Sequence, residues 1–250
     1  MQISHRAQSP SFWWRYASPA TFYPLAGRLV PLFALAAVAF AIPGLWVGMF
    51  VAPADFQQGE GYRIIFVHVP ASWMAMLVYC VIAFWGAMAL IFNTRLSGMM
   101  MAALAPTGAM FTFLSLWTGA LWGKPMWGTW WVWDARITST LILLFLYLAL
   151  IALRSAIDDE RRADRACALL ALVSVVNVPI IYFSVQWWST LHQGASVTLT
   201  DTSMAPIMLW PMLLMVMAFW MYTIAVTLMR VRIIIVERER HARWLQHALE

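Results

Sequence analysis

The sequence has few charged residues and almost no cysteine. Only 11% of its 250 residues are Asp, Glu, Lys or Arg, and 63% are hydrophobic. A soluble globular domain has roughly 25% charged residues. The two cysteines, Cys80 and Cys167, lie far apart in apolar stretches, so we expect neither a disulfide nor a cysteine metal site. The composition excludes a soluble domain and indicates a polytopic membrane protein.

The sequence also lacks a phosphate-binding loop. The nearest match, residues 119–125, places Gly119 and Gly123 one residue too close together. Pro125 then stands where such a loop requires Ser or Thr. A nucleotide site is therefore not expected in this chain.

Six apolar stretches are long enough to cross a bilayer, which takes about 20 residues of helix. We expect spans at residues 29–52, 69–92, 99–121, 137–153, 166–185 and 205–229. The first is too long for the core of a cleaved signal peptide, so we expect it to be retained. With no linker or second domain in evidence, residues 1–250 are predicted to form one all-α domain, a bundle of six transmembrane helices.

Two features refine this prediction. Pro43, Pro106, Pro179 and Pro211 fall within the spans, where each removes a backbone donor and is expected to bend its helix. The largest polar insert, residues 154–165 (RSAIDDERRADR), is expected to be a solvated cytoplasmic loop.

The basic residues predict the orientation of the bundle. If the N-terminus is cytoplasmic, 13 of the 16 basic residues fall on the cytoplasmic side, and only Arg63, Lys124 and Arg136 fall on the other. Cytoplasmic segments of membrane proteins carry such an excess. Both termini are therefore expected in the cytoplasm, and the net charge of +5 is explained by contact with anionic membrane lipid, with no nucleic-acid partner.

Tryptophan gathers in one outer segment, WGKPMWGTWWVWDAR at residues 122–136. It contains Trp122, Trp127, Trp130, Trp131 and Trp133. Indole offers a wide, flat and polarizable surface, so this segment can form a platform for a large planar ligand. The alternative is an aromatic belt at the membrane interface, where tryptophan gathers whatever the function.

Two histidines fall on the same side as the tryptophans. His68 lies in FVHVPASW just before the second span, and His192 lies in QWWSTLHQG after the fifth. A lone histidine here is more often structural, but two beside a tryptophan cluster favour a shared role. Imidazole is a strong iron ligand, and a porphyrin needs axial ligands on both faces and apolar surface against its rings. We therefore predict that these histidines are axial ligands of haem.

Charged residues could complete such a site. Arg63, Lys124 and Arg136 are cations that could pair with haem propionates. Asp134 stands at the start of the fourth span, where a carboxylate caps helical N–H groups. Pairing with Arg136, or orienting a residue that contacts the ligand, is the functional alternative for Asp134.

At these residues the chain resembles a known family. WGKPMWGTWWVWDAR is similar to the tryptophan-rich WWD signature of membrane proteins that handle haem in cytochrome c biogenesis. Together with FVHVPASW and WWSTLHQG in six spans, it closely resembles the haem exporter protein C family over residues 52–193. The resemblance implies transient binding of b-type haem at the periplasmic face of a bacterial inner membrane. It also implies that His68 and His192 are the axial ligands and that Trp122, Trp127 and Asp134 occupy functional positions.

The resemblance further implies partners. Asp55, Gln58 and Arg63 lie in the first outer segment, which in the family is associated with handing haem to its acceptor. The implied partners are a periplasmic haem chaperone that receives haem covalently, an ATP-binding cassette pair and a small single-span subunit. The expected role is binding and transfer of haem, without catalytic residues of the chain's own.

Two other functions predict different sequence features. A membrane electron-transfer cytochrome usually buries both histidine ligands within its helices, whereas His68 and His192 are predicted at helix mouths and loops. A secondary transporter or channel usually has ionisable residues near the bilayer midplane. The predicted spans have almost none.

Overall fold

The computed structural model describes residues 17–192, 194, 196–197 and 201–249. Over these residues it has six spans that are long and apolar enough to cross a membrane, and no strand beyond two isolated bridges. The predicted all-α membrane fold is confirmed. Arg6 and Arg15, two of the cations counted on the cytoplasmic side, lie outside the described residues.

The helices are longer than the apolar stretches that predict them. The first span combines α2 (Pro19–Trp46) with the π-helical η1 (Val47–Val51), and the second combines the 3-10 helix η2 (Glu60–Ile64) with α3 (Ile65–Phe92). The others are α4 (Arg95–Trp127), α5 (Ala135–Ala156), the pair α6 (Glu160–Ser174) and α7 (Asn177–Trp187), and α8 (Pro206–Arg238). A short α9 (Arg243–Leu249) follows.

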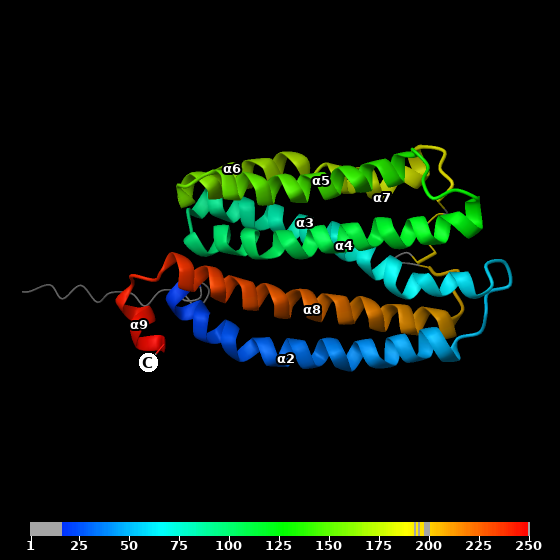
Figure 1. The fold of residues 1–250 in the computed structure, drawn as a ribbon, viewed down its shortest axis with the longest axis horizontal. Helices are drawn as coiled ribbons and strands as arrows, with labels where there is room; N and C mark the ends of the chain where they lie inside the picture. Colours follow the sequence, from blue (N-terminus) through cyan, green and yellow to red (C-terminus); the bar gives the residue numbers. More distant parts are fainter. Residues whose placement is uncertain (1–16, 193, 195, 198–200, 250) are drawn as a thin grey trace, which may run out of the picture.

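These helices form layers. α2 packs along α8, and α8 in turn packs on α3 and α4. α5, α6 and α7 cover the other side of the α3–α4 pair (Figure 1). The connections that follow η1, α4 and α7 all lie at one end of the molecule, on the right of Figure 1. This is the grouping of outer segments that the sequence predicts.

The polar insert at residues 154–165 is mostly helical, so the prediction of a loop is wrong. α5 continues to Ala156 and α6 begins at Glu160. The Asp159 carboxylate accepts a hydrogen bond from the Arg162 N–H at 2.7 Å and caps α6. Arg154 and Arg238 both form ion pairs with Asp164, so charges that suggest a solvated loop instead join α5, α6 and α8.

The fifth span is broken near its middle. Pro179 has no N–H to bond the Val175 oxygen in a helix, and Val178 N–H takes that oxygen at 3.0 Å instead. The polar groups at the break are bonded to neighbouring helices: Asn177 Nδ2 donates to the Ser139 oxygen at 2.9 Å. The predicted bend at Pro179 is thus a break between two helices.

The largest cluster of buried residues lies between α3, α4, α5 and α6–α7. Tyr79 and Tyr147 meet edge to face with ring centres 4.9 Å apart, and the Tyr147 hydroxyl donates to the Ala75 oxygen at 2.7 Å. The Tyr147 ring lies directly on Gly108, where an added Cβ would be 2.1 Å from the ring. These two tyrosines fill part of the interior of the bundle between α3, α4 and α5.

Candidate functional site

A pocket opens at the end of the bundle where the three outer connections meet. It encloses about 980 Å³ of space, including open solvent at its mouth. α3, α4, α5 and α7 form its walls, and the segment after α7 contributes His192. Its polar and aromatic lining consists of His68, Ser72, Ser115, Trp122, Trp127, Trp130, Trp131, Arg136, Thr140 and His192.

His68 lies in the first turn of α3, inside the helix, because the helical span begins earlier than the sequence predicts. Tyr62 and Phe66, on the turns around it, are buried against α8, and this packing extends the helix outward. Arg63 also donates to the Gly48 oxygen at 2.6 Å and ties the start of this span to η1.

Thr118 determines which nitrogen of the His68 imidazole is available to bind a metal ion. The Thr118 hydroxyl donates its single proton to the Leu114 oxygen at 2.6 Å. Its oxygen is therefore an acceptor for His68 Nδ1, which lies 2.9 Å away and carries the ring proton. Nε2 of His68 is left with its lone pair, the form in which imidazole binds a metal. Gly119 leaves room for the ring, since an added Cβ would lie 3.2 Å from His68 Cε1.

His192 is held from a different direction. The Asp134 carboxylate caps α5 by accepting a hydrogen bond from the Ile137 N–H at 2.8 Å. Its other oxygen accepts a bond from the Thr190 hydroxyl, whose oxygen accepts the His192 backbone N–H at 3.1 Å. The capping role expected for Asp134 is present, and the same side chain also holds the segment that carries His192.

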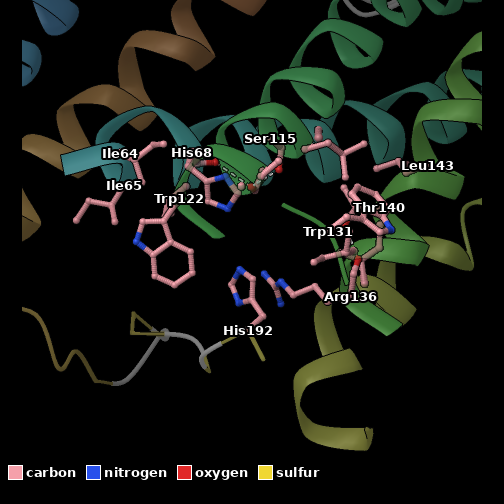
Figure 2. A pocket seen from close by; sticks show the side chains of 18 of the residues that line it. Ile64, Ile65, His68, Ser115, Trp122, Trp131, Arg136, Thr140, Leu143 and His192 are labelled. Atoms are coloured by element: carbon pink, nitrogen blue, oxygen red, sulfur yellow. Dashed lines mark hydrogen bonds between the residues drawn. The ribbon is translucent and has the colours of Figure 1, made fainter. Parts of the chain in front are cut away.

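The two imidazoles face each other across the pocket (Figure 2). Their ring centres are 6.3 Å apart and their planes are tilted by 31°. A bond between an imidazole nitrogen and a metal ion is about 2 Å long. The separation of 6.3 Å between the ring centres therefore leaves room for one metal ion between a nitrogen of each ring.

Four of the five predicted tryptophans line the pocket. Trp122 and Trp127 meet edge to face at 4.9 Å, and the Trp127 ring lies 6.4 Å from that of His192. Trp130 and Trp131 complete the aromatic wall. Trp133 is 75% exposed and is not part of the lining.

The three outer cations have different environments. Arg136 lines the pocket and points toward His192 in the view of Figure 2. Lys124 donates to the Gly128 oxygen at 3.1 Å, at the end of α4. Arg63 is paired with Glu60 in addition to its bond to Gly48. Only Arg136 of the three is a lining residue.

The first outer segment contacts the pocket wall through Gln58. Asp55 Oδ1 accepts hydrogen bonds from the N–H groups of Gln57 and Gln58 at 2.9 and 2.8 Å, which fixes a tight turn. Gln58 Oε1 then accepts the Trp122 indole N–H at 3.0 Å. Phe56, which follows Asp55 in the turn, is 91% exposed.

Sequence reasoning missed the hydroxyl groups of this site. Thr118 and Thr190 hold the two histidines, and Ser72 and Ser115 bond to each other at 2.6 Å beside His68. One signal was present: Ser115, Thr118 and Gly119 are small or polar residues three and four apart, on one face of an apolar helix.

A sequence model of the family described as Heme exporter protein C matches residues 12–246. The chain belongs to this family. It is 47% identical to the Heme exporter protein C of Haemophilus influenzae, over 92% of this chain and 94% of that protein. It is 45% identical to the protein of that name from Escherichia coli K12, over 93% of this chain and 94% of that protein.

A third member of the heme exporter protein C family, from Bradyrhizobium diazoefficiens, is 46% identical over 86% of this chain and 82% of its own length. The match to the family model covers every residue that lines the pocket. The pocket therefore lies in the part of the chain that is common to the family.

Proposed function

We propose that this chain binds haem in the pocket, between His68 and His192, and passes it to a periplasmic haem chaperone for cytochrome c maturation. The observation that carries the proposal is the pair of facing imidazoles, 6.3 Å apart between ring centres, in an aromatic pocket. Haem is the cargo in this proposal. It is held non-covalently, as a b-type haem, and only transiently.

The residues of the pocket suit a porphyrin. Trp122, Trp127, Trp130 and Trp131 provide apolar surface for a planar macrocycle, and Arg136 provides a cation for a propionate. The indole nitrogen of Trp131 is buried and has no hydrogen-bond partner among the described residues. A carboxylate of the cargo is a suitable acceptor for that N–H group.

The position of the histidines favours delivery over electron transfer. His68 is near the outer end of its helix, His192 is in a segment outside the helices, and the pocket between them is open. Ala75, Leu143 and Ile181, which are buried in the bundle, form part of the pocket lining. Cargo therefore has access from the outer end of the bundle, which suits a protein that loads and unloads haem.

Charge supports a periplasmic pocket in the bacterial inner membrane. Arg63, Lys124 and Arg136 are the basic residues at the pocket end of the described chain. The opposite end carries Arg28, Arg95, Arg154, Arg161, Arg162, Arg165, Arg230, Arg232, Arg238, Arg240 and Arg243. The excess of arginine is expected on the cytoplasmic side, with both termini.

The proposed partners contact different parts of the protein. The chaperone docks at the pocket end of the bundle, where Phe56, Trp130 and Trp133 are exposed. Asp55, Gln58 and Arg63 shape the turn that presents Phe56. An ATP-binding cassette pair and a small single-span subunit complete the complex within the membrane.

The test is the removal of each ligand in the full-length protein, purified in detergent. His68→Gly and His192→Gly should each lower haem retention and abolish the low-spin spectrum of a bis-histidine haem. Added imidazole should partly restore both, because it fills the vacant coordination position. His241→Gly, in the exposed region after α8, is the matched control and should behave as wild type. Unchanged spectra in both pocket variants would remove the two-histidine site.

A further inference from the structure

Thr190 connects the segment that carries His192 to the first turn of α5. Its hydroxyl donates to Asp134 Oδ2, and its oxygen accepts the His192 backbone N–H at 3.1 Å. The Asp134 carboxylate is only 9% exposed, and its other oxygen is bonded to the Ile137 N–H at 2.8 Å. One buried carboxylate thus fixes both the start of a helix and, through Thr190, the backbone at His192.

We infer that Thr190 is a positioning residue for His192, so that its hydroxyl keeps the imidazole facing His68 across the pocket. The inference rests on the proposed haem site. Hydrogen bonds to a carboxylate are about twice as strong as those between neutral groups, and they are stronger still when shielded from water. Residues that orient a metal ligand through hydrogen bonds, without binding the metal themselves, affect the affinity of the site for the metal.

The two ligands are held by different means. His68 belongs to a regular helix, whose backbone bonds fix its position even without Thr118. His192 follows the end of α7 at Trp187 by five residues and has no helix to fix it. The hydrogen bonds of Thr190 connect the backbone at His192 to the start of α5, so their loss should weaken one axial ligand and leave the other in place.

Thr190→Val tests this, because valine has nearly the shape of threonine but neither donates nor accepts a hydrogen bond. We expect haem retention to fall about 10- to 100-fold, with loss of the low-spin bis-histidine spectrum and its partial return with imidazole. Thr190→Ser keeps the hydroxyl and should retain the wild-type spectrum. Ser189→Ala, at the exposed neighbouring position, is the matched control and should also match wild type.

A double-mutant comparison separates positioning of His192 from a general loss of structure. Imidazole is supplied so that each single-histidine background still retains haem. If Thr190 acts through His192, Thr190→Val should cause no further loss of haem in His192→Gly but a further loss in His68→Gly. Equal losses in both backgrounds, or a wild-type spectrum for Thr190→Val alone, would overturn the inference. A different result would contradict the proposed function itself: unchanged haem spectra in the His68→Gly and His192→Gly single variants.

Discussion

Trp127 is both the last residue of α4 and part of the pocket lining. Gly128 follows with a φ of 77°, the left-handed conformation that ends a helix at low cost for glycine. The chain turns away there, and the indole packs back over Gly123, where an added Cβ would lie 3.1 Å from the ring. The ring consequently reaches both Trp122 and His192.

Trp127→Ala should therefore weaken haem binding without affecting membrane insertion. The loss of one aromatic contact corresponds to about two- to tenfold in affinity, from the usual 0.5–1.5 kcal/mol. Trp46→Ala is the matched control, because Trp46 is 61% exposed on α2 and lies outside the pocket. Haem titration of both variants measures the effect. Equal small losses in the two variants would favour the aromatic belt.

At the residue level, the sequence identifies the side chains with distinctive chemistry. It does not identify the residues that hold them in place through hydrogen bonds. His68, His192 and four of the tryptophans stand out by type, and the structure brings them to one pocket. Thr118 and Thr190 do not stand out, because a hydroxyl becomes informative only when its partner is known. Those partners come from tertiary packing: His68 is 50 positions away from Thr118, and Asp134 is 56 away from Thr190.

Among the helices, α4 and α5 pack closely below the pocket because Gly108 has no side chain. The Tyr147 ring occupies the space that a Cβ would need, and its hydroxyl reaches the Ala75 oxygen of α3. One tyrosine thus fixes three helices relative to each other. The pocket lies directly above this contact, with Ala75 and Leu143 among its lining residues.

Gly108→Ala should destabilise the bundle, because the added methyl would lie 2.1 Å from Tyr147 and the tyrosine is fully buried. Overpacking of this kind costs about 1–3 kcal/mol. Gly61→Ala is the control, since its only neighbour would be Met126 at 3.6 Å. Thermal unfolding in detergent should show a lower midpoint for the first variant only. Coincident unfolding curves would show that Tyr147 can move aside.

The number of spans and their helical type could be predicted, but not all of the helix ends. Hydrophobic length is a property of the sequence alone, so each of the six predicted spans corresponds to a span in the structure. The ends depend on local bonds, such as the Asp159 cap that begins α6 inside a charged insert. The break before Asn177 follows from Pro179, whose effect the sequence indicates, whereas its location depends on the bond from Val178 to Val175.

At the scale of the whole molecule, the two ends present different surfaces. The pocket end exposes large aromatic side chains, including Phe56, Trp133 and Trp187. The opposite end carries ion pairs that join its helices, such as Arg238 with Asp164 and Arg95 with Glu239. Large exposed aromatic residues mark contacts with a partner protein or with the membrane. Under the proposed function, we therefore expect delivery of the cargo at the pocket end.

The direction of delivery can be tested with photo-crosslinkers placed at single positions of the full-length protein in membranes. Phe56 and Trp133 are highly exposed and lie outside the ligand-holding bonds, so labels there should not disturb haem binding. Both should form adducts with the periplasmic haem chaperone. Asp158, exposed in the connection between α5 and α6 at the opposite end, is the control and should form none. Adducts from Asp158 alone would place the acceptor at the other end and refute outward delivery, even if haem is bound between His68 and His192.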